Sequence, residues 1–189
     1  SGLIHRHFGY DNTGFHLGSN EITLDINGML SPDDLLMIET KANEAVFANV
    51  TLYCRYPAPE ELVSMEYRSK LDLTENVRIV TIPGYDDCAC CAPHVKMTGE
   101  VGMIKIIKAI SYKGGMRISF LCGRRALAEI QGYQNSVQKI SMLLSAKTDE
   151  IIPAVDKLKS DMAALKYEMI ALQKKAVSEK AARLPDGTV

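Results

Sequence analysis

The sequence reads Asp87-Cys88-Ala89-Cys90-Cys91-Ala92-Pro93-His94-Val95 near its middle. Three of the chain's five cysteines and one of its four histidines lie in this stretch, directly after the apolar run 77–82. Cys90 and His94 form the pattern C-x-x-x-H, and a thiolate and an imidazole at such short spacing are typical zinc ligands. Pro93 restricts the backbone beside His94. Zinc needs four ligands, or three and a water in catalytic sites, so this pair alone does not complete a site.

Other motifs accompany this stretch in a fixed order. They are Thr13-Gly14-Phe15-His16-Leu17-Gly18, Ile22-Thr23-Leu24-Asp25-Ile26, Thr98-Gly99-Glu100-Val101-Gly102, and Gly115-Met116-Arg117-Ile118-Ser119-Phe120 with Gly123, Ala126 and Leu127. Together with Cys90–Val95, they make roughly residues 1–130 resemble the editing domain of alanyl-tRNA synthetases and the free-standing alanyl-tRNA editing proteins. The threonyl-tRNA synthetase editing domain carries a related motif, also with proline before the histidine.

The resemblance implies an activity and a set of site residues. The implied reaction is hydrolysis of mischarged aminoacyl-tRNA, in particular Ser or Gly attached to the alanine tRNA, with Zn²⁺ as cofactor and the tRNA acceptor end as partner. Cys90 and His94 are the implied metal ligands. Thr13 and His16 fall in the segment that lines the amino-acid pocket, and Arg117 falls near the tRNA end. We take these last three residues as the catalytic candidates.

One motif of the family is absent from this sequence. An H-x-x-x-H pair normally precedes the segment that Ser1-Gly2-Leu3-Ile4 resembles, and His5 and His7 cannot replace it because they are two apart and do not share a helical face. We therefore expect the chain to be a fragment that lacks the first two metal ligands and holds zinc weakly or not at all. The turn residues at 184–187 suggest that it is also truncated at its C-terminal end.

Several of these residues also have structural interpretations. His16 could be a structural histidine, Arg117 could form an exposed ion pair, and Cys54 and Cys122 fit small core positions. Extra cysteines at 88 and 91 either pack within the loop or substitute as ligands, and with Cys90 and His94 they could close a structural zinc site. A competing hypothesis for the whole chain is a catalytically inactive module for tRNA binding or oligomerisation.

Composition narrows the class of protein. A hydrophobic content of 47% supports a real core, and a net charge of −1 excludes a global basic field for nucleic acid. The longest apolar runs are too short to span a membrane. Five cysteines, an odd number with three clustered, favour a reducing cytoplasm over a disulfide framework.

The first two thirds of the chain mix strand and helix patterns. Expected elements are a helix ending near His7, strands at 21–27, 50–56 and 77–82, a helix from Ser31 to about Ala48, a short helix at 59–62, and a strand pair at 103–110 and 116–122. This order predicts an α+β fold of the synthetase second-additional-domain type, with a mixed or antiparallel sheet and packed helices.

The last third is helical. Its apolar residues step by four and three along Ile151, Val155, Leu158, Met162, Leu165, Met169, Leu172 and Ala176, and an earlier helix carries Val137, Ile140 and Leu144. Such spacing defines a heptad seam. We therefore divide the chain into an editing-like domain at 1–124 and a coiled-coil extension at 125–189. The extension should form a helical hairpin or a homodimer seam.

Overall fold

The computed structural model describes residues 1–69 and 76–183 and divides the chain into two compact units, Ser1–Ile130 and Gln131–Val189. The elements of the first unit are α1 (Gly2–Phe8), β1 (Asn12–Leu17), β2 (Ile22–Ile26), α2 (Pro32–Phe47), β3 (Tyr53–Arg55), α3 (Pro59–Ser64), β4 (Ile79–Ile82), β5 (Asp86–Ala89), η1 (Thr98–Val101), β6 (Ile104–Tyr112) and β7 (Gly115–Cys122). The predicted α+β class with antiparallel sheets and packed helices is confirmed.

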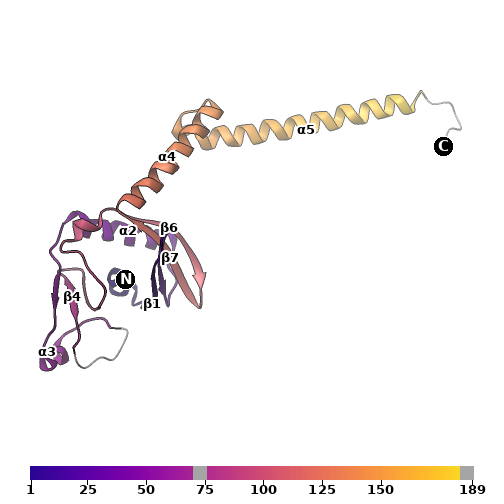
Figure 1. Ribbon diagram of the computed structural model, residues 1–189. Coiled ribbons are helices and arrows are strands. Elements are labelled where there is room, and N and C mark those ends of the chain that lie inside the picture. Colours follow the sequence, from indigo (N-terminus) through magenta and orange to yellow (C-terminus); the bar gives the residue numbers. More distant parts are fainter. Residues whose placement is uncertain (70–75, 184–189) are drawn as a thin grey trace. The chain divides into compact units, whose positions relative to one another are not determined.

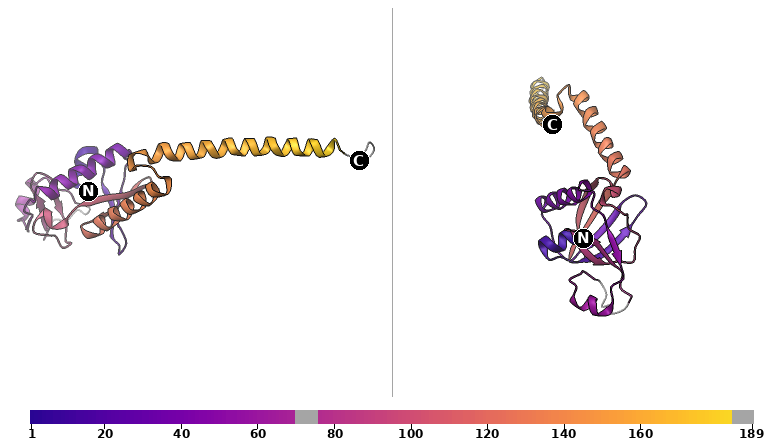
Figure 2. Two further views of the ribbon diagram at one scale, coloured as in Figure 1. Left: turned by 90° about the horizontal axis from the view of Figure 1, so that it is seen from above. Right: turned by 90° about the vertical axis from the view of Figure 1, so that its left-hand side faces the viewer.

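A four-stranded antiparallel sheet in the order β1-β2-β7-β6 forms the centre of this unit. Alternate residues of β2, namely Ile22, Leu24 and Ile26, are buried on one side of the sheet, and Met116 and Ile118 of β7 are buried beside the last two. Helices α1 and α2 cover that side (Figure 1; Figure 2, right). The resulting core consists of Ile4, Leu24, Ile26, Leu30, Ile38, Met116 and Ile118.

Side chains of α2 clamp the helix to the edge strand β6. Glu39 accepts hydrogen bonds from Lys105 Nζ at 2.7 Å and from the Ile106 amide at 2.6 Å. Asn43 pairs with both backbone groups of Ile104, each at 2.8 Å. The register of β6 shifts between Ile106 and Lys108, and Glu39 satisfies an amide at this bulge. The clamp fixes α2 over the sheet.

Helix α2 begins at the predicted position after Ser31, and its start forms a capping box. Ser31 Oγ accepts from the Asp34 amide at 3.2 Å, and Asp34 accepts from the Ser31 amide at 2.9 Å. The hydroxyl and the amide of Ser31 both donate to the Asp34 carboxylate and lower its pKa. The folded state therefore favours the ionised carboxylate.

We expect Ser31→Ala to lower the free energy of unfolding by about 1 kcal/mol at neutral pH, because the cap bonds are lost. A carboxyl group with a lowered folded-state pKa stabilises the fold above its unfolded pKa of about 4, and this contribution is lost as the pH falls through the folded value. Denaturation should be measured for the wild type and Ser31→Ala at pH 7 and below pH 4. The difference in their free energies of unfolding should be smaller in acid. Thr40→Ala is the control, since Thr40 bonds only to Leu36 O within the same helix. An equal loss of unfolding free energy in Ser31→Ala and Thr40→Ala would contradict a stabilising role of the cap.

A second antiparallel sheet, in the order β3-β4-β5, lies with α3 at the opposite end of the unit from β6 and β7 (Figure 1). One face packs Val77 and Ile79 against Leu62 of α3. The predicted strand 50–56 is shorter than expected, because only Tyr53–Arg55 pairs with β4, whereas Thr51 bridges to Met97. This small sheet carries the Cys-rich stretch.

Helix α4 (Arg124–Leu144) follows β7 after Gly123 and crosses the boundary between the two units. Its first turn is tied to the first unit, because Arg125 Nη1 donates to Gly18 O at 3.2 Å and Ser19 O at 3.0 Å. These carbonyls lie in the turn between β1 and β2.

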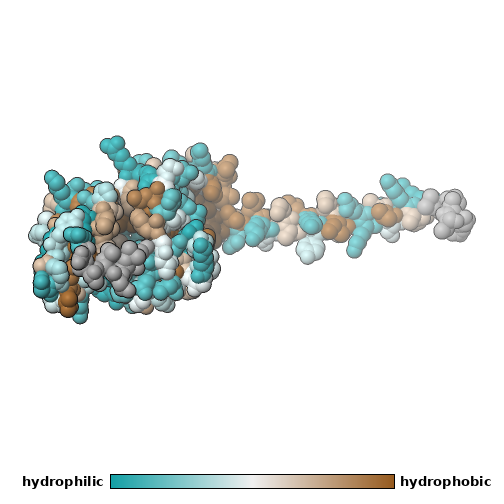
Figure 3. Space-filling model, turned by 60° about the horizontal axis from the view of Figure 1, so that its bottom comes forward, coloured by the Kyte–Doolittle hydropathy of each residue, from teal (hydrophilic) through white to brown (hydrophobic). Residues whose placement is uncertain are grey.

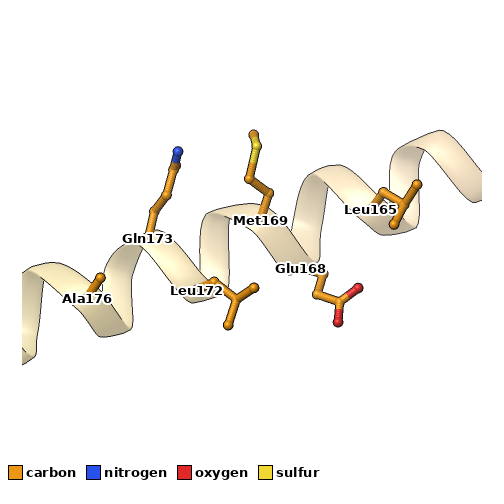
Figure 4. A pocket seen from close by; sticks show the side chains of 6 residues that line it. All are labelled: Leu165, Glu168, Met169, Leu172, Gln173 and Ala176. Atoms are coloured by element: carbon orange, nitrogen blue, oxygen red, sulfur yellow. The ribbon is translucent and has the colours of Figure 1, made fainter.

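The second unit continues through η2 (Thr148–Glu150) into α5 (Ile151–Ala181). None of the residues of α5 is buried, and Leu158 and Leu165 of the predicted seam are 58% and 65% exposed. Figure 3 shows apolar and polar residues interspersed along the helical part of the chain. An open apolar groove runs along 165–176, and all the side chains that line it come from α5 itself (Figure 4). Within the described part of the second unit, the seam from Leu158 onward is thus an exposed surface.

Candidate functional site

The Cys-rich stretch is built on the β4–β5 hairpin. Ile79 pairs with Ala89 and Val80 with Cys88, and Gly84 makes the turn with a φ of 79° that favours glycine. Sequence patterns did not predict β5, because its first two residues are acidic and its length is only four residues. Strand β5 forms because it pairs with the apolar strand β4. Cys90 follows directly after Ala89, which forms the last residue pair of this hairpin with Ile79.

Cys88 lies on the face of the small sheet that is opposite the Ile79 cluster. It pairs with Val80, which in turn pairs with Cys54, so the three residues form one row across the sheet. Burial, and after it the nearby Asp86 carboxylate, raise the pKa of Cys88 to about 11. Cys88 is therefore a protonated thiol at neutral pH, which agrees with a packing role.

Arg78 holds the loop that contains the two predicted metal ligands. The Cys90 amide donates to Arg78 O at 3.0 Å, which extends the strand pairing by one step. The guanidinium then donates through Nη1 to Cys90 O at 2.8 Å and to Ala92 O at 2.9 Å. Its Nη2 donates to Cys54 Sγ at 3.1 Å. Sequence reasoning missed Arg78, because nothing local relates it to residues more than ten positions away.

The ring of His94 is oriented by the same carbonyl. His94 Nδ1 lies 2.8 Å from Ala92 O. A carbonyl oxygen only accepts, so Nδ1 must carry the proton of this bond. In the neutral ring, Nε2 is then the nitrogen with a free lone pair. A backbone carbonyl bonded to one ring nitrogen is the usual arrangement around a histidine that binds metal through the other.

The two ligands do not make a complete metal site by themselves. Within residues 1–69 and 76–183, no group of three or more His, Cys, Asp or Glu side chains is arranged to hold a metal ion. The closed zinc site considered from the sequence, with Cys88, Cys90, Cys91 and His94, is therefore not formed by the described residues. Cys90 and His94 fit zinc in chemistry but not in number.

The start of α1 packs against β5. Arg68 donates to both carboxylate oxygens of Asp86, at 2.8 and 2.5 Å, and to Ser1 Oγ at 3.2 Å. A Cβ on Gly2 would lie only 2.2 Å from Asp86 Cγ, so glycine is required for this approach. These contacts place the first residues of the chain beside the strand that leads to Cys90. No local pattern in the sequence indicates the Arg68–Asp86 pair.

Thr13 and His16 lie on β1 at the edge of the large sheet, and both are exposed. The register shifts between Asn12 and Gly14, so Thr13 occupies a bulge. His16 pairs with Thr23 and shares its face of the sheet. This face is opposite the one that α1 and α2 cover. The bulge was not predicted, since it depends on the pairing with β2.

Arg117 on β7 is engaged in an ion pair. Its Nε and Nη2 donate to the two oxygens of Asp25, at 2.6 and 2.7 Å, and its guanidinium lies 3.7 Å from the ring centre of Tyr112. The bonds to Asp25 raise the pKa of Arg117. Among the hydrogen bonds and ion pairs of the described residues, none joins Thr13, His16 or Arg117 to the Cys90–His94 loop. A common pocket for both groups stays a prediction.

Comparison with known proteins supports this architecture. Residues 77–119, from the strand before the Cys-rich loop to the middle of β7, match the Threonyl and Alanyl tRNA synthetase second additional domain. An alanine–tRNA ligase of Methanobrevibacter smithii is 31% identical over 83% of this chain and 18% of its own length. Alanyl-tRNA editing protein AlaX-L of Pyrococcus horikoshii is 24% identical over 100% of this chain and 49% of its own length. Alanyl-tRNA editing protein Aarsd1 of Danio rerio is 27% identical over 90% of this chain and 43% of its own length.

These matches define the class first: over residues 77–119 the chain is similar to the second additional domain of threonyl- and alanyl-tRNA synthetases. The more particular resemblance, to alanyl-tRNA editing domains and proteins, is confirmed as well. The chain spans about half or less of the length of these relatives. No helix in the described part of the chain is long and apolar enough to cross a membrane.

Proposed function

We propose that this chain provides the editing part of a hydrolase that removes a wrong amino acid, Ser or Gly, from the alanine tRNA. Support comes from relatives named as alanyl-tRNA editing proteins and from the ordered loop that presents Cys90 and His94. An aminoacyl ester is already activated, so the enzyme mainly needs a positioned water and a stabilised oxyanion. A metal ion, when bound, is able to supply both.

We assign Cys90 and His94 as two of the zinc ligands, with the other ligands outside the described residues. The loop conformation suits this role, because His94 Nε2 is the ring nitrogen left for a metal. Thr13, exposed at the bulge of β1, would select Ser by bonding its hydroxyl and leave Ala with an unpaired polar group beside it. His16 would face the same substrate. Arg117, oriented by Asp25, would lie toward the tRNA.

The RNA partner is the single-stranded acceptor end. A chain with a net charge of −1 lacks a general basic surface, so contacts are local stacking and backbone interactions. The absence of disulfides among the five cysteines fits a cytoplasmic setting for this reaction. Self-association through the α5 seam, as a homodimer, completes the proposal.

A second candidate is a catalytically inactive module that binds tRNA and assembles through its helices. It is favoured by the incomplete ligand set of the described residues and by the exposed seam of α5. Hydrolysis measurements separate the two candidates directly.

We expect the native protein to hydrolyse Ser-tRNA and Gly-tRNA of the alanine system much faster than Ala-tRNA, and to lose this activity with a chelator. Cys90→Ala should reduce both hydrolysis and zinc content by about 100-fold or more, because a ligand is removed. Cys91→Ala is the matched control, a neighbouring exposed thiol that should leave both unchanged.

The metal content of the 189-residue chain itself should be well under one zinc per chain, because two ligands hold zinc poorly. Stoichiometric, tightly held zinc would point instead to Cys88 or Cys91 as additional ligands. Unchanged hydrolysis and zinc content in Cys90→Ala would refute the editing assignment of this loop.

A further inference from the structure

We propose that Arg78 is a positioning residue that sets the backbone of the 90–94 loop and, through it, the ring nitrogen that His94 presents. The inference rests on the proposed function only in giving this loop a part in hydrolysis. Its structural basis is separate and lies in the contacts of one guanidinium group.

The first step concerns the loop carbonyls. Cys90 O and Ala92 O both point at Arg78 Nη1, at 2.8 and 2.9 Å. Two carbonyl oxygens that converge on one point repel each other unless a cation or donors lie between them. Cys90, Ala92 and His94 are at least partly exposed, so water would otherwise solvate these carbonyls and the loop could open. Arg78 is the group that makes the closed conformation favourable.

The second step leads from the carbonyl to the histidine. Ala92 O accepts from Arg78 Nη1 at 2.9 Å and from His94 Nδ1 at 2.8 Å, and a carbonyl has two lone pairs, so both are used. Arg78 therefore fixes the direction of the oxygen that selects the Nδ1–H tautomer of His94. Without Arg78, the carbonyl is free to rotate and the selection is lost.

The third step concerns the type of residue. The fork of the guanidinium reaches three acceptors in fixed directions, two through Nη1 and Cys54 Sγ through Nη2. A lysine carries its donors on a single nitrogen and cannot reproduce this planar geometry. Arg78→Lys should therefore restore the charge but only part of the loop order.

The role of Arg78 is separable from folding. The strand pairing beside it uses main-chain atoms, Cys90 N to Arg78 O at 3.0 Å, and these remain in any variant. The neighbouring residues Val77, Ile79 and Val80 form the buried part of the small sheet. Replacing the Arg78 side chain should thus leave the sheet in place.

The test compares Arg78→Met and Arg78→Lys with Arg55→Met. Arg55 lies on β3 of the same sheet, pairs there with Ile79 and forms an ion pair with Glu61, so it is a matched control that does not touch the loop. Long-range ¹H–¹⁵N spectra of the full chain, recorded at a pH of about 8.5, which is well above the pKa of free histidine, report the His94 tautomer. His94→Gln assigns its signals, and thermal unfolding checks the fold.

We expect the wild type and Arg55→Met to show the Nδ1–H tautomer. Arg78→Met should shift His94 mainly to the Nε2–H form that free histidine favours in water, with Arg78→Lys in between. In hydrolysis of Ser-tRNA by the native protein, Arg78→Met should lower kcat by about 10- to 100-fold with KM nearly unchanged, as loss of an outer partner of a ligand typically does.

An unchanged His94 tautomer in a folded Arg78→Met variant would overturn the inference, as would an equal change in Arg55→Met. A wild-type protein without hydrolytic activity would instead refute the proposed function. In that case the spectra still decide the role of Arg78, because they do not depend on turnover.

Discussion

Leu158→Glu combined with Leu165→Glu should convert a self-associating chain into a monomer. Both leucines lie on the heptad seam of α5, where they are 58% and 65% exposed. An apolar stripe of this length is stable in water mainly when a second helix covers it. We expect that helix to come from a second copy.

Each copy would bring two carboxylates into that seam, so four would have to be buried without partners in the dimer. The combined cost is on the order of 5 kcal/mol, which raises the dissociation constant by more than about 1,000-fold. Sedimentation over a range of concentrations measures this directly, and far-UV circular dichroism verifies that the helix persists.

Ser160→Glu with Tyr167→Glu is the matched control. These positions lie two residues after each leucine, on the outer face of the same helix, and the variant adds the same charge. It should leave the association unchanged. A wild-type chain that sediments as a monomer with a fully helical α5 would show that the homodimer proposal is wrong.

The second large effect is expected in the core of the main sheet. Ile26 is 2% exposed and lies on the inner strand β2, where it pairs with Asn12 on one side and Met116 on the other. Ile26→Ala should lower the free energy of unfolding by about 2–5 kcal/mol, because it removes buried methyl groups and leaves a cavity. That is a large fraction of the total stability of a typical domain, about 5–15 kcal/mol.

Denaturation should be followed by the near-UV signal of tyrosines, since α5 dominates the far-UV signal and is not part of this core. Leu17→Ala serves as the control on the same face of the same sheet. Leu17 is 68% exposed, so its loss should cost less than about 0.5 kcal/mol. Similar losses of unfolding free energy in Ile26→Ala and Leu17→Ala would mean that the core is not centred on β2.

Elements with a strong local pattern could be predicted from the sequence. The alternation in β2, the N-terminal signals of α2 and the apolar spacing of α5 all depend on residues within a few positions of one another, and the strand and the two helices form where expected. The α+β class followed from their order. The order of motifs around Cys90 and His94 also identified the relatives correctly.

The rest of the candidate site depends on contacts between distant segments. Strand β5 exists because β4 offers it a partner, and the bulge at Thr13 exists because β1 and β2 differ by one residue in register. Arg78 acts on carbonyls 12 and 14 positions away, and Arg68 on a carboxylate 18 positions away. Periodicity and motif spacing carry no information about such pairs.

The attachment of α4 has a mechanical consequence. Arg125, in the first turn of α4, is bonded to Gly18 O and Ser19 O, so the base of this helix and the hairpin that carries Thr13 and His16 form one connected structure. The turn between β1 and β2 therefore cannot shift without breaking these two hydrogen bonds or moving the first turn of α4 with it.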